Sequence, residues 1–220
     1  MLYIVSTPIG NLGDITYRAV EVLKSVDLIA CEDTRHTKVL LEAYGIKAAL
    51  TSYHSYSHDA KEGWIIGVLK EGKSAALVSD AGTPGISDPG YRLIRRALES
   101  GVEVISIPGP SAFAAALSVS GFSANKFFYD GFLPVKSGAR KNRLIWLKGL
   151  EVTVVVYESP HRILKTLEDM QEVLGNARIV VAREITKKFE EVIRANISDV
   201  IQRFKESKPK GEFVLIFGPK

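Results

Sequence analysis

Cysteine is almost absent from this chain of 220 residues, which contains only Cys31. A single cysteine excludes an internal disulfide and a zinc site built from cysteines, and it fits the reducing environment of the cytoplasm. Cys31 comes at the end of an apolar run, so we expect it to be a small buried residue of the core.

The sequence also lacks a stretch that is typical of secretion or of a membrane span. The first ten residues, MLYIVSTPIG, have no basic residue before the apolar run and no hydrophobic run of signal-peptide length. The 22 residues from Val104 to Asn125 carry no charge, but the turn Pro108–Pro110 and Gly121 interrupt them, so a spanning helix is not expected. We therefore predict a cytoplasmic protein without a targeting or membrane segment.

Several catalytic motifs are missing as well. The chain has no HExxH, no GxSxG, no protein-kinase signature and no Cys–His pair at the spacing of metal ligands. The loop Ser6–Asp14 has neither the GxGxxG spacing of a dinucleotide site nor the lysine of a P-loop. These absences argue against metal-dependent, serine-hydrolase and phosphoryl-transfer chemistry, and we expect no bound metal ion.

The composition is that of a folded protein with a modest basic excess. Apolar residues make up 46% of the chain and charged residues 25%, with a net charge of +4 and a pI near 9.0. This length and apolar content are enough for one large domain or two small ones. The positive charge allows a polyanionic partner such as RNA but does not require one.

The first half of the chain alternates short apolar strands with segments of helical period, such as Ile65, Val68 and Leu69. Repeated strand–helix units predict an α/β domain with a mostly parallel sheet and crossover helices. The expected strands are Leu2–Val5, Leu28–Cys31, Ala48–Thr51, Ala75–Val78 and Val102–Ile107.

The second half begins after the turn Pro108–Gly109–Pro110. Several of its strands are joined by short links, which predicts a second α/β domain with a mixed sheet. We place the domains at 1–109 and 112–220, with Ser111 as the N-cap of a helix over 112–119. The expected strands are 127–132, 152–157, 178–182, 191–195 and 213–217, and the other expected helices are 136–148, 160–174 and 198–205.

The loop Ser79–Gly90, with the sequence SDAGTPGISDPG, follows the expected strand at Ala75–Val78. Its glycines permit positive φ or a close approach to a ligand, and its prolines stiffen the backbone. Asp88 and Pro89 predict the N-cap and the first residue of the next helix. Ligands of open α/β sheets bind beyond the carboxyl ends of strands, so we expect a small-molecule site here; the alternative is a turn without a ligand.

Other strand ends carry further candidate residues. Ser6–Asp14 predicts either a ligand loop or a plain turn. Glu32 and Asp33 fit the ordinary acidic start of a helix, whereas Arg35, followed by His36, can hold a phosphate or a carboxylate.

Charged residues also follow two strands of the second half. YESPHR, at 157–162, lies at a strand-to-helix junction, and Arg183–Glu184 follow another strand. Such residues act in acid–base catalysis or anchor a substrate; the alternative is that Glu158 and Arg162 only pair with each other. The basic helix 136–148, which contains Arg140 and Lys141, presents either a solvated face or an RNA-binding face.

Together, the motifs STPIGNLGD, CEDTRHT, SDAGTPGISDPG, PGPSA, YESPHR and GEFVLIFG resemble the tetrapyrrole methylase-like superfamily, in order and spacing, over essentially the whole chain. EDTRHT and YESPHR resemble its bacterial branch that methylates the ribose 2′-hydroxyl of a cytidine in the decoding region of 16S rRNA. The resemblance implies two α/β domains, S-adenosylmethionine bound in the cleft between them, and a homodimer.

The resemblance also implies roles for particular residues. Those expected to line the cofactor pocket are Pro8, Asp80, Ala81, Gly82, Thr83, Pro84, Ser111, Ala112, Tyr157, Ala182, Gly211, Glu212 and Phe213. Candidates for the general base are Glu158, His161 and Glu184, and candidates for binding RNA are Arg35, His36, Arg162, Arg183, Arg140 and Lys141. We expect Ser79–Gly90 to position the methyl donor, with the reactive group for the ribose coming from the second domain.

Two other functions stay open at this point. A methylase of a tetrapyrrole also has an anionic substrate and would welcome the same basic residues. A catalytically idle RNA-binding factor could share the fold. The aromatic residues Phe127, Phe128 and Tyr129 are possible stacking platforms for bases, but their strand-like alternation favours packing in the core.

Overall fold

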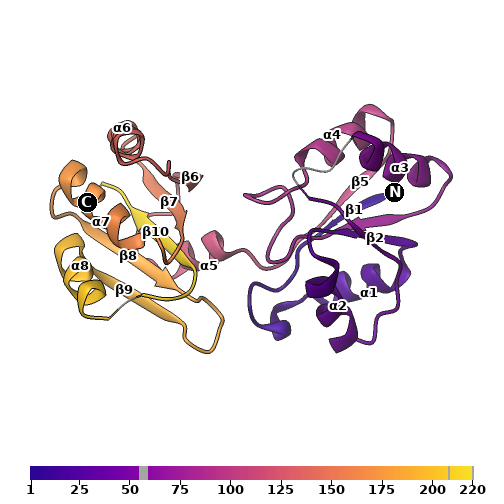
Figure 1. Cartoon of the computed structure of the whole chain (residues 1–220), viewed down its shortest axis with the longest axis horizontal. Coiled ribbons are helices and arrows are strands. Elements are labelled where there is room, and N and C mark those ends of the chain that lie inside the picture. Colours follow the sequence, from indigo (N-terminus) through magenta and orange to yellow (C-terminus); the bar gives the residue numbers. More distant parts are fainter. Residues whose placement is uncertain (55–58, 208, 220) are drawn as a thin grey trace. The chain divides into compact units, whose positions relative to one another are not determined.

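The computed structural model describes residues 1–54, 59–207 and 209–219. The chain divides into two compact units, Met1–Ser111 and Ala112–Lys220, and each is described by itself (Figure 1).

The first unit contains a five-stranded sheet in the order β3-β2-β4-β1-β5. Every neighbouring pair is parallel, which confirms the mostly parallel sheet predicted from the alternation of strands and helices. The strands are β1 (Leu2–Val5), β2 (Leu28–Cys31), β3 (Leu50–Ser52), β4 (Ala75–Leu77) and β5 (Val104–Ile107).

Helices cover both faces of this sheet. The helices α1 (Tyr17–Ser25) and α2 (Thr34–Ala43) pack on one face, and α3 (Asp59–Lys70) and α4 (Tyr91–Glu99) pack on the other (Figure 1). The connections after the neighbouring strands β1 and β4 therefore lead to helices on opposite faces of the sheet. In open α/β sheets the loops that part at such a point form a ligand crevice.

The second unit contains a five-stranded mixed sheet in the order β6-β7-β10-β8-β9. The pair β6–β7 is parallel and the other three pairs are antiparallel, which confirms the mixed sheet. The strands are β6 (Phe127–Phe132), β7 (Thr153–Glu158), β8 (Arg178–Arg183), β9 (Glu191–Asn196) and β10 (Phe213–Phe217). All five residues of the apolar strand β10 are buried, as expected for a central strand covered on both faces.

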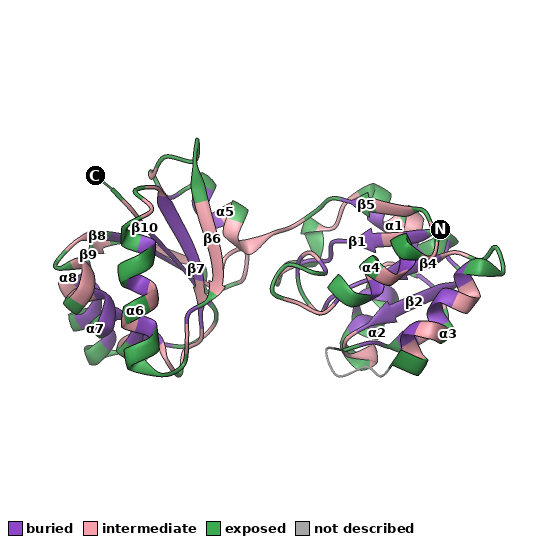
Figure 2. Cartoon of the chain, turned by 90° about the horizontal axis from the view of Figure 1, so that it is seen from above, coloured by how far each residue is buried: buried purple, intermediate pink, exposed green. Residues whose placement is uncertain are grey.

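The helices α6 (Ser137–Lys148), α7 (Ile163–Leu174) and α8 (Ile197–Glu206) cover one face of the second sheet. The short helix α5 (Ala112–Ser118) packs on the other face, against Val155, Ala182 and Val214. In each unit the buried strands lie under helices whose outer sides are exposed (Figure 2).

Local signals fixed most element ends to within two or three residues, but the predicted cap of α4 was wrong. This helix begins at Tyr91, its N-cap is Gly90, and no side chain makes the capping hydrogen bond that we expected from Asp88. Gly90 has a φ of +154°, and a Cβ at this position would lie 3.0 Å from the backbone nitrogen of Gly85. The close contact and the positive φ both require glycine at position 90, and Pro89 lies outside the helix.

No helix in the part of the chain that the structure describes combines the length and the apolar character needed to cross a membrane.

Candidate functional site

The loops that follow β1 and β4 are joined directly. Thr7 and Gly82 exchange backbone hydrogen bonds of 2.9 and 3.0 Å, and the hydroxyls of Ser6 and Thr83 lie 2.8 Å apart. The Thr7 hydroxyl also donates to the carbonyl oxygen of Ser79 at 3.0 Å. These bonds hold the start of the loop Ser79–Gly90 in one conformation at the point where β1 and β4 part.

The loop after β5 lies against the same two loops. A Cβ at Gly109 would lie 2.9 Å from Cβ of Ser6, and a Cβ at Gly82 would lie 3.4 Å from Cγ2 of Ile9. Gly82 also has a φ of +81°, which favours glycine. The close approach of the loops after β1 and β5 therefore requires glycine at 109, and the backbone conformation requires glycine at 82.

Acidic groups gather beside these loops at the ends of β2 and β4. The Asp80 carboxylate accepts a hydrogen bond of 3.1 Å from the backbone N–H of Asp33. Burial raises the pKa of Glu32, the charge of Asp80 raises it further, and His54 partly offsets both. The first unit thus offers carboxylates and backbone groups, the kind of surface that recognises hydroxyl, amino and cationic groups of a ligand.

Two expected RNA-binding residues follow on α2. Asp33 caps this helix through the Arg35 backbone N–H, and it accepts two hydrogen bonds from the Arg35 guanidinium, at 3.2 and 2.8 Å. These bonds hold the pKa of the Asp33 carboxyl well below its ordinary value. The Arg35 side chain is 90% exposed, and His36 is exposed beside it, so both can reach an external anion.

In the second unit, the register of the strands brings the candidate residues together at one end of the sheet, where several strands begin or finish. Val214 lies opposite both Tyr157 and Ala182, and Phe213 lies opposite both Glu158 and Arg183. Phe132 lies opposite Tyr157 from the other side. We call this end of the sheet the Tyr157 edge; it comprises Phe132, Tyr157–Glu158, Ala182–Glu184 and Gly211–Phe213. Ala182 and Phe213 are buried in this unit, and Tyr157 beside them is partly exposed.

Glu184 is fixed in place at the Tyr157 edge. Its Oε1 accepts hydrogen bonds of 3.0 Å from the Glu212 backbone N–H and from Lys187 Nζ, and Lys187 also pairs with the Glu212 carboxylate at 2.7 Å. Burial raises the pKa of Glu184, but the hydrogen bonds and the charges of Lys187 and Arg183 lower it more, so the net shift is downward. This carboxylate stays ionised and is a weak proton acceptor.

Glu158 is enclosed by its own unit. Its side chain is 0% exposed, and its carboxylate accepts hydrogen bonds from Thr166 Oγ1 at 2.6 Å and from the Ser159 backbone N–H at 2.8 Å. Arg162 Nη2 lies 3.3 Å from the same carboxylate, so the expected alternative, pairing of Glu158 with Arg162, is confirmed. A carboxylate so enclosed cannot touch a substrate, which argues against the role of general base and for a role in positioning Arg162.

His161 lies in the turn between β7 and α7 and is exposed. It is the one of the three base candidates that is neither buried nor held by a cation in the contacts of the described residues. Arg183, at the same edge, is 24% exposed and lies 3.6 Å from the Glu191 carboxylate, so part of its guanidinium stays available.

The burial of Arg140 argues against its predicted role in binding RNA. Its side chain is 4% exposed and pairs with Asp169, with a 2.7 Å hydrogen bond from Nε. The next residue, Lys141, is 30% exposed and pairs with Glu172 at 2.5 Å. The basic helix therefore turns one cation into the interior and ties the next to a surface carboxylate.

Sequence reasoning missed three residues of the second unit that contact the candidate residues: Thr166 and Asp169 on α7, and Phe132 at the Tyr157 edge. Thr166 and Arg162 lie one helical turn apart, so their spacing could have suggested a shared partner for the buried Glu158. Asp169 and Phe132 gave no such local signal, because their partners are distant in the sequence.

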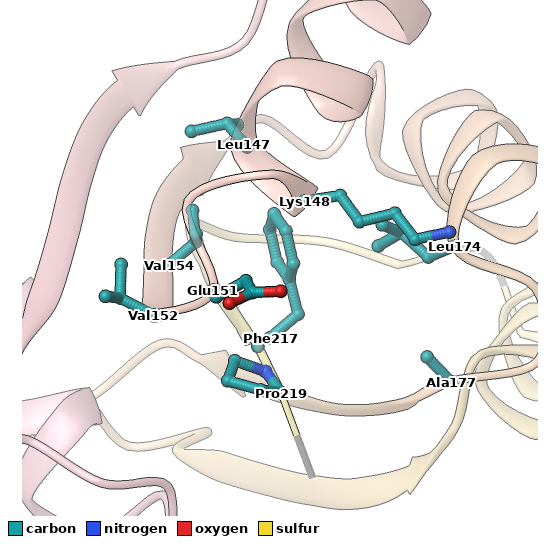
Figure 3. A pocket seen from close by; sticks show the side chains of 10 residues that line it. Leu147, Lys148, Glu151, Val152, Val154, Leu174, Ala177, Phe217 and Pro219 are labelled. Carbon is teal, nitrogen blue, oxygen red and sulfur yellow. The ribbon is translucent and has the colours of Figure 1, made fainter.

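A cavity of about 250 Å³ lies at the other end of the second sheet (Figure 3). Val154 and Phe217 line it and are register partners, whereas Phe213 and Glu158 are partners at the Tyr157 edge. None of the predicted site residues lines this cavity. Within residues 1–54, 59–207 and 209–219, no group of three or more His, Cys, Asp or Glu could hold a metal ion.

Comparisons with known proteins bear on both units. The family model for Tetrapyrrole (Corrin/Porphyrin) Methylases matches residues 1–201. "Ribosomal RNA small subunit methyltransferase I" of Escherichia coli O157:H7 is 49% identical over 98% of this chain and 76% of its own length. The protein of the same name from Thermotoga maritima is 46% identical over 100% of this chain and 98% of its own.

Solved structures are similar in fold at low identity. The structure of a diphthine synthase has a TM-score of 0.79 at 15% identity, and the match covers 100% of this chain and 90% of the synthase chain. The cobalt precorrin-4 methyltransferase CbiF has a TM-score of 0.72 at 17% identity, over 98% of this chain and 93% of its own. At such identities the likeness speaks for the fold alone.

Proposed function

This chain belongs to the tetrapyrrole methylase family and is a methyltransferase that uses S-adenosylmethionine, and we propose that its substrate is the 16S rRNA of the small ribosomal subunit. The methylated group is the 2′-hydroxyl of a cytidine ribose in the decoding region. The observation that carries the proposal is the identity of 46% and 49%, over nearly the whole chain, with proteins named ribosomal RNA small subunit methyltransferase I. The cobalt precorrin-4 methyltransferase is only 17% identical to this chain, so its similarity supports a shared fold and not a tetrapyrrole substrate.

The first unit is suited to hold the cofactor. Ala81 is exposed in a loop held by the Thr7–Gly82 bridge, and Asp80 and Thr83 on either side of Ala81 and Gly82 are partly exposed. A ligand with adenine, amino and carboxylate ends needs such backbone groups at close range. The residues that we propose for this role are Pro8, Asp80–Pro84, Ser111 and Ala112, and in the second unit Tyr157, Ala182 and Gly211–Phe213.

Bound S-adenosylmethionine supplies an electrophilic methyl group on a sulfonium. The task of this chain is to hold the ribose oxygen in line with that methyl group, and orientation of this kind contributes about 7–11 kcal/mol to catalysis. We propose His161 as the group that accepts the proton of the hydroxyl, because Glu158 is enclosed and Glu184 is held as an ionised carboxylate.

Polar side chains with exposed surface are proposed to contact RNA phosphates: Arg35 and His36 in the first unit, and Arg183, Lys141 and Arg162 in the second. We also propose that the protein acts in the cytoplasm as a homodimer, which would widen the surface available to RNA. Sedimentation equilibrium of the purified chain measures its mass in solution directly.

Transfer of labelled methyl from S-adenosylmethionine tests the function. The acceptors are small ribosomal subunits without this methyl group, naked 16S rRNA and a tetrapyrrole such as uroporphyrinogen. We expect incorporation into the rRNA, at the 2′-oxygen of a cytidine. Cofactor binding without incorporation into either rRNA substrate would contradict the proposal, and incorporation into the tetrapyrrole alone would replace it.

A further inference from the structure

The edge strand β6 contains a bulge next to the Tyr157 edge. Tyr129 lies opposite Val155 of β7, Gly131 opposite Val156 and Phe132 opposite Tyr157, so Asp130 is one extra residue. In a regular strand, side chains three residues apart point to opposite faces of the sheet. The extra residue shifts the alternation by one position, so Tyr129 and Phe132 lie on the same face. Tyr129 and Phe132 therefore lie against the same ring, that of Tyr157, with ring centres 5.2 and 5.8 Å away.

The extra residue is held by the helix on the other face of the sheet. The Asp130 side chain is 7% exposed, and its two oxygens accept hydrogen bonds from Arg143 Nε at 3.1 and 3.0 Å. The Arg143 guanidinium lies over the Trp146 ring, 4.1 Å from its centre. Gly131, the next residue, has a φ of +65°. Only glycine adopts this backbone conformation without strain.

The backbone after Phe132 is held as firmly. Arg162 donates to the carbonyl oxygen of Leu133 at 2.6 Å, and Arg140 donates to that of Val135 at 3.0 Å. Each arginine is backed by a buried carboxylate, so three arginine–carboxylate pairs fix residues 130–135: Arg143–Asp130, Arg162–Glu158 and Arg140–Asp169.

Phe132 is 54% exposed although its backbone is fixed on both sides. Tyr157, which supports it, is itself held by a 3.0 Å hydrogen bond from the Phe113 backbone N–H to its hydroxyl. An aromatic ring held in this way can stack a flat partner with little further loss of conformational entropy. The cations of the same edge, Arg183 and Lys187, are each paired with carboxylates, so the feature that suits a nucleic-acid base is the exposed ring of Phe132.

We propose that Phe132 is the platform on which a base of the RNA substrate stacks, and that residues 130–135 are built to present it. The inference rests on the proposed rRNA substrate. Chemistry on a ribose inside a folded RNA requires a nucleotide that is drawn out of its stack, and an aromatic ring at the site replaces the lost stacking.

Substitutions at Phe132 separate stacking from apolar packing. We expect Phe132→Ala and Phe132→Leu to lower kcat/KM for small ribosomal subunits by about 5- to 150-fold, the range that the energy of one stacked base gives. Phe132→Trp, which keeps a π face, should stay within about threefold of the wild type. Calorimetry should give the same Kd for S-adenosylmethionine in all four proteins. Phe127→Leu, at the exposed other end of β6, is the matched control and should act as wild type.

A binding measurement distinguishes failure of this inference from failure of the proposed function. A base that stacks on the indole ring introduced by Phe132→Trp quenches its fluorescence. Titration of this variant with a single-stranded oligoribonucleotide should therefore quench emission more than in the wild type. If the oligoribonucleotide quenches the emission but the wild type does not methylate rRNA, base stacking on Phe132 is supported and the proposed function is contradicted. Normal methylation of rRNA by Phe132→Leu would overturn the inference, as would a loss that is confined to the affinity for S-adenosylmethionine. It would also be overturned if the enzyme methylated a tetrapyrrole faster than rRNA and that reaction depended on Phe132.

Discussion

Gly211 lies directly under the side chain of Glu184: a Cβ at residue 211 would overlap Cγ and Cδ of that glutamate. Gly211 also has a φ of +92°, which L side chains rarely adopt. The Glu184 carboxylate can reach the Glu212 backbone N–H, at 3.0 Å, only because residue 211 has no side chain.

We therefore predict that Gly211→Ala lowers the free energy of unfolding by about 1–3 kcal/mol, the usual cost of strain at such a backbone conformation. It should also weaken binding of S-adenosylmethionine, because residues 211–213 are proposed to line its pocket. Urea denaturation and calorimetry measure the two effects. Gly67→Ala is the control: Gly67 lies inside α3 with no atom near its missing Cβ, so this variant should be neutral or more stable. Equal stability of the two variants would contradict the steric argument.

His161→Ala is predicted to lower the methylation rate by about 10²- to 10⁴-fold, the usual contribution of a general base. The side chain is exposed, so the free energy of unfolding should change by no more than about 0.5 kcal/mol. Single-turnover transfer of labelled methyl measures the rate. The control is Lys165→Ala: Lys165 is an exposed residue in the first turn of α7, and this variant should keep the wild-type rate. A normal rate in His161→Ala would remove this residue from the catalytic role.

Glu158→Gln is predicted to act through the fold. Removal of one charge from a buried ion pair leaves Arg162 without compensation, and such changes cost about 3–5 kcal/mol. We expect a lower melting temperature and a lower kcat/KM for rRNA, with little change in the Kd of S-adenosylmethionine. Thr166→Val, which removes the side-chain hydrogen bond to the same carboxylate, should shift stability in the same direction. A large loss of rate in Glu158→Gln at unchanged stability would restore Glu158 as a catalytic candidate.

The pKa of Glu184 predicts how stability depends on pH. Its folded-state pKa lies below the ordinary value of 4.5, so the unfolded chain binds a proton more readily than the folded chain does. The stabilisation by Glu184 is therefore fully present above about pH 4.5 and is lost as the pH falls through the folded-state pKa. The difference in unfolding free energy between the wild type and Glu184→Gln should shrink over that range. A difference that stays constant from neutral pH into the acid range would show that the carboxylate is not stabilised by its neighbours.

Arg140 and Lys141 are adjacent but should respond differently to removal. Arg140→Ala leaves the buried Asp169 without its main partner and is predicted to cost about 3–5 kcal/mol. Lys141→Ala removes partly exposed ion pairs and should cost no more than about 1 kcal/mol. Thermal denaturation of both variants tests the contrast. Similar melting temperatures would mean that the Arg140–Asp169 pair does not hold α6 to α7.

Local sequence patterns determined the elements of both units. The run FVLIF predicted a strand at 213–217, and this strand, the strand 127–132 and Leu2–Val5 were placed with their observed ends. Period and turn residues are local properties, so a linear sequence carries them in full. The glycine- and proline-rich motifs at strand ends likewise marked the loops that meet between β1 and β4, because those loops need backbone conformations that few residues allow.

The tertiary structure alone decided which charged and aromatic side chains face inward. Arg140 is buried and Lys141 is not, since the partner of Arg140 lies 29 residues away on α7. Glu158 is enclosed because Thr166 and Arg162 meet it across a helical turn, and Phe132 reaches the face of Tyr157 only through the extra residue in β6. Burial and orientation of this kind depend on contacts between distant segments, which composition and period do not encode.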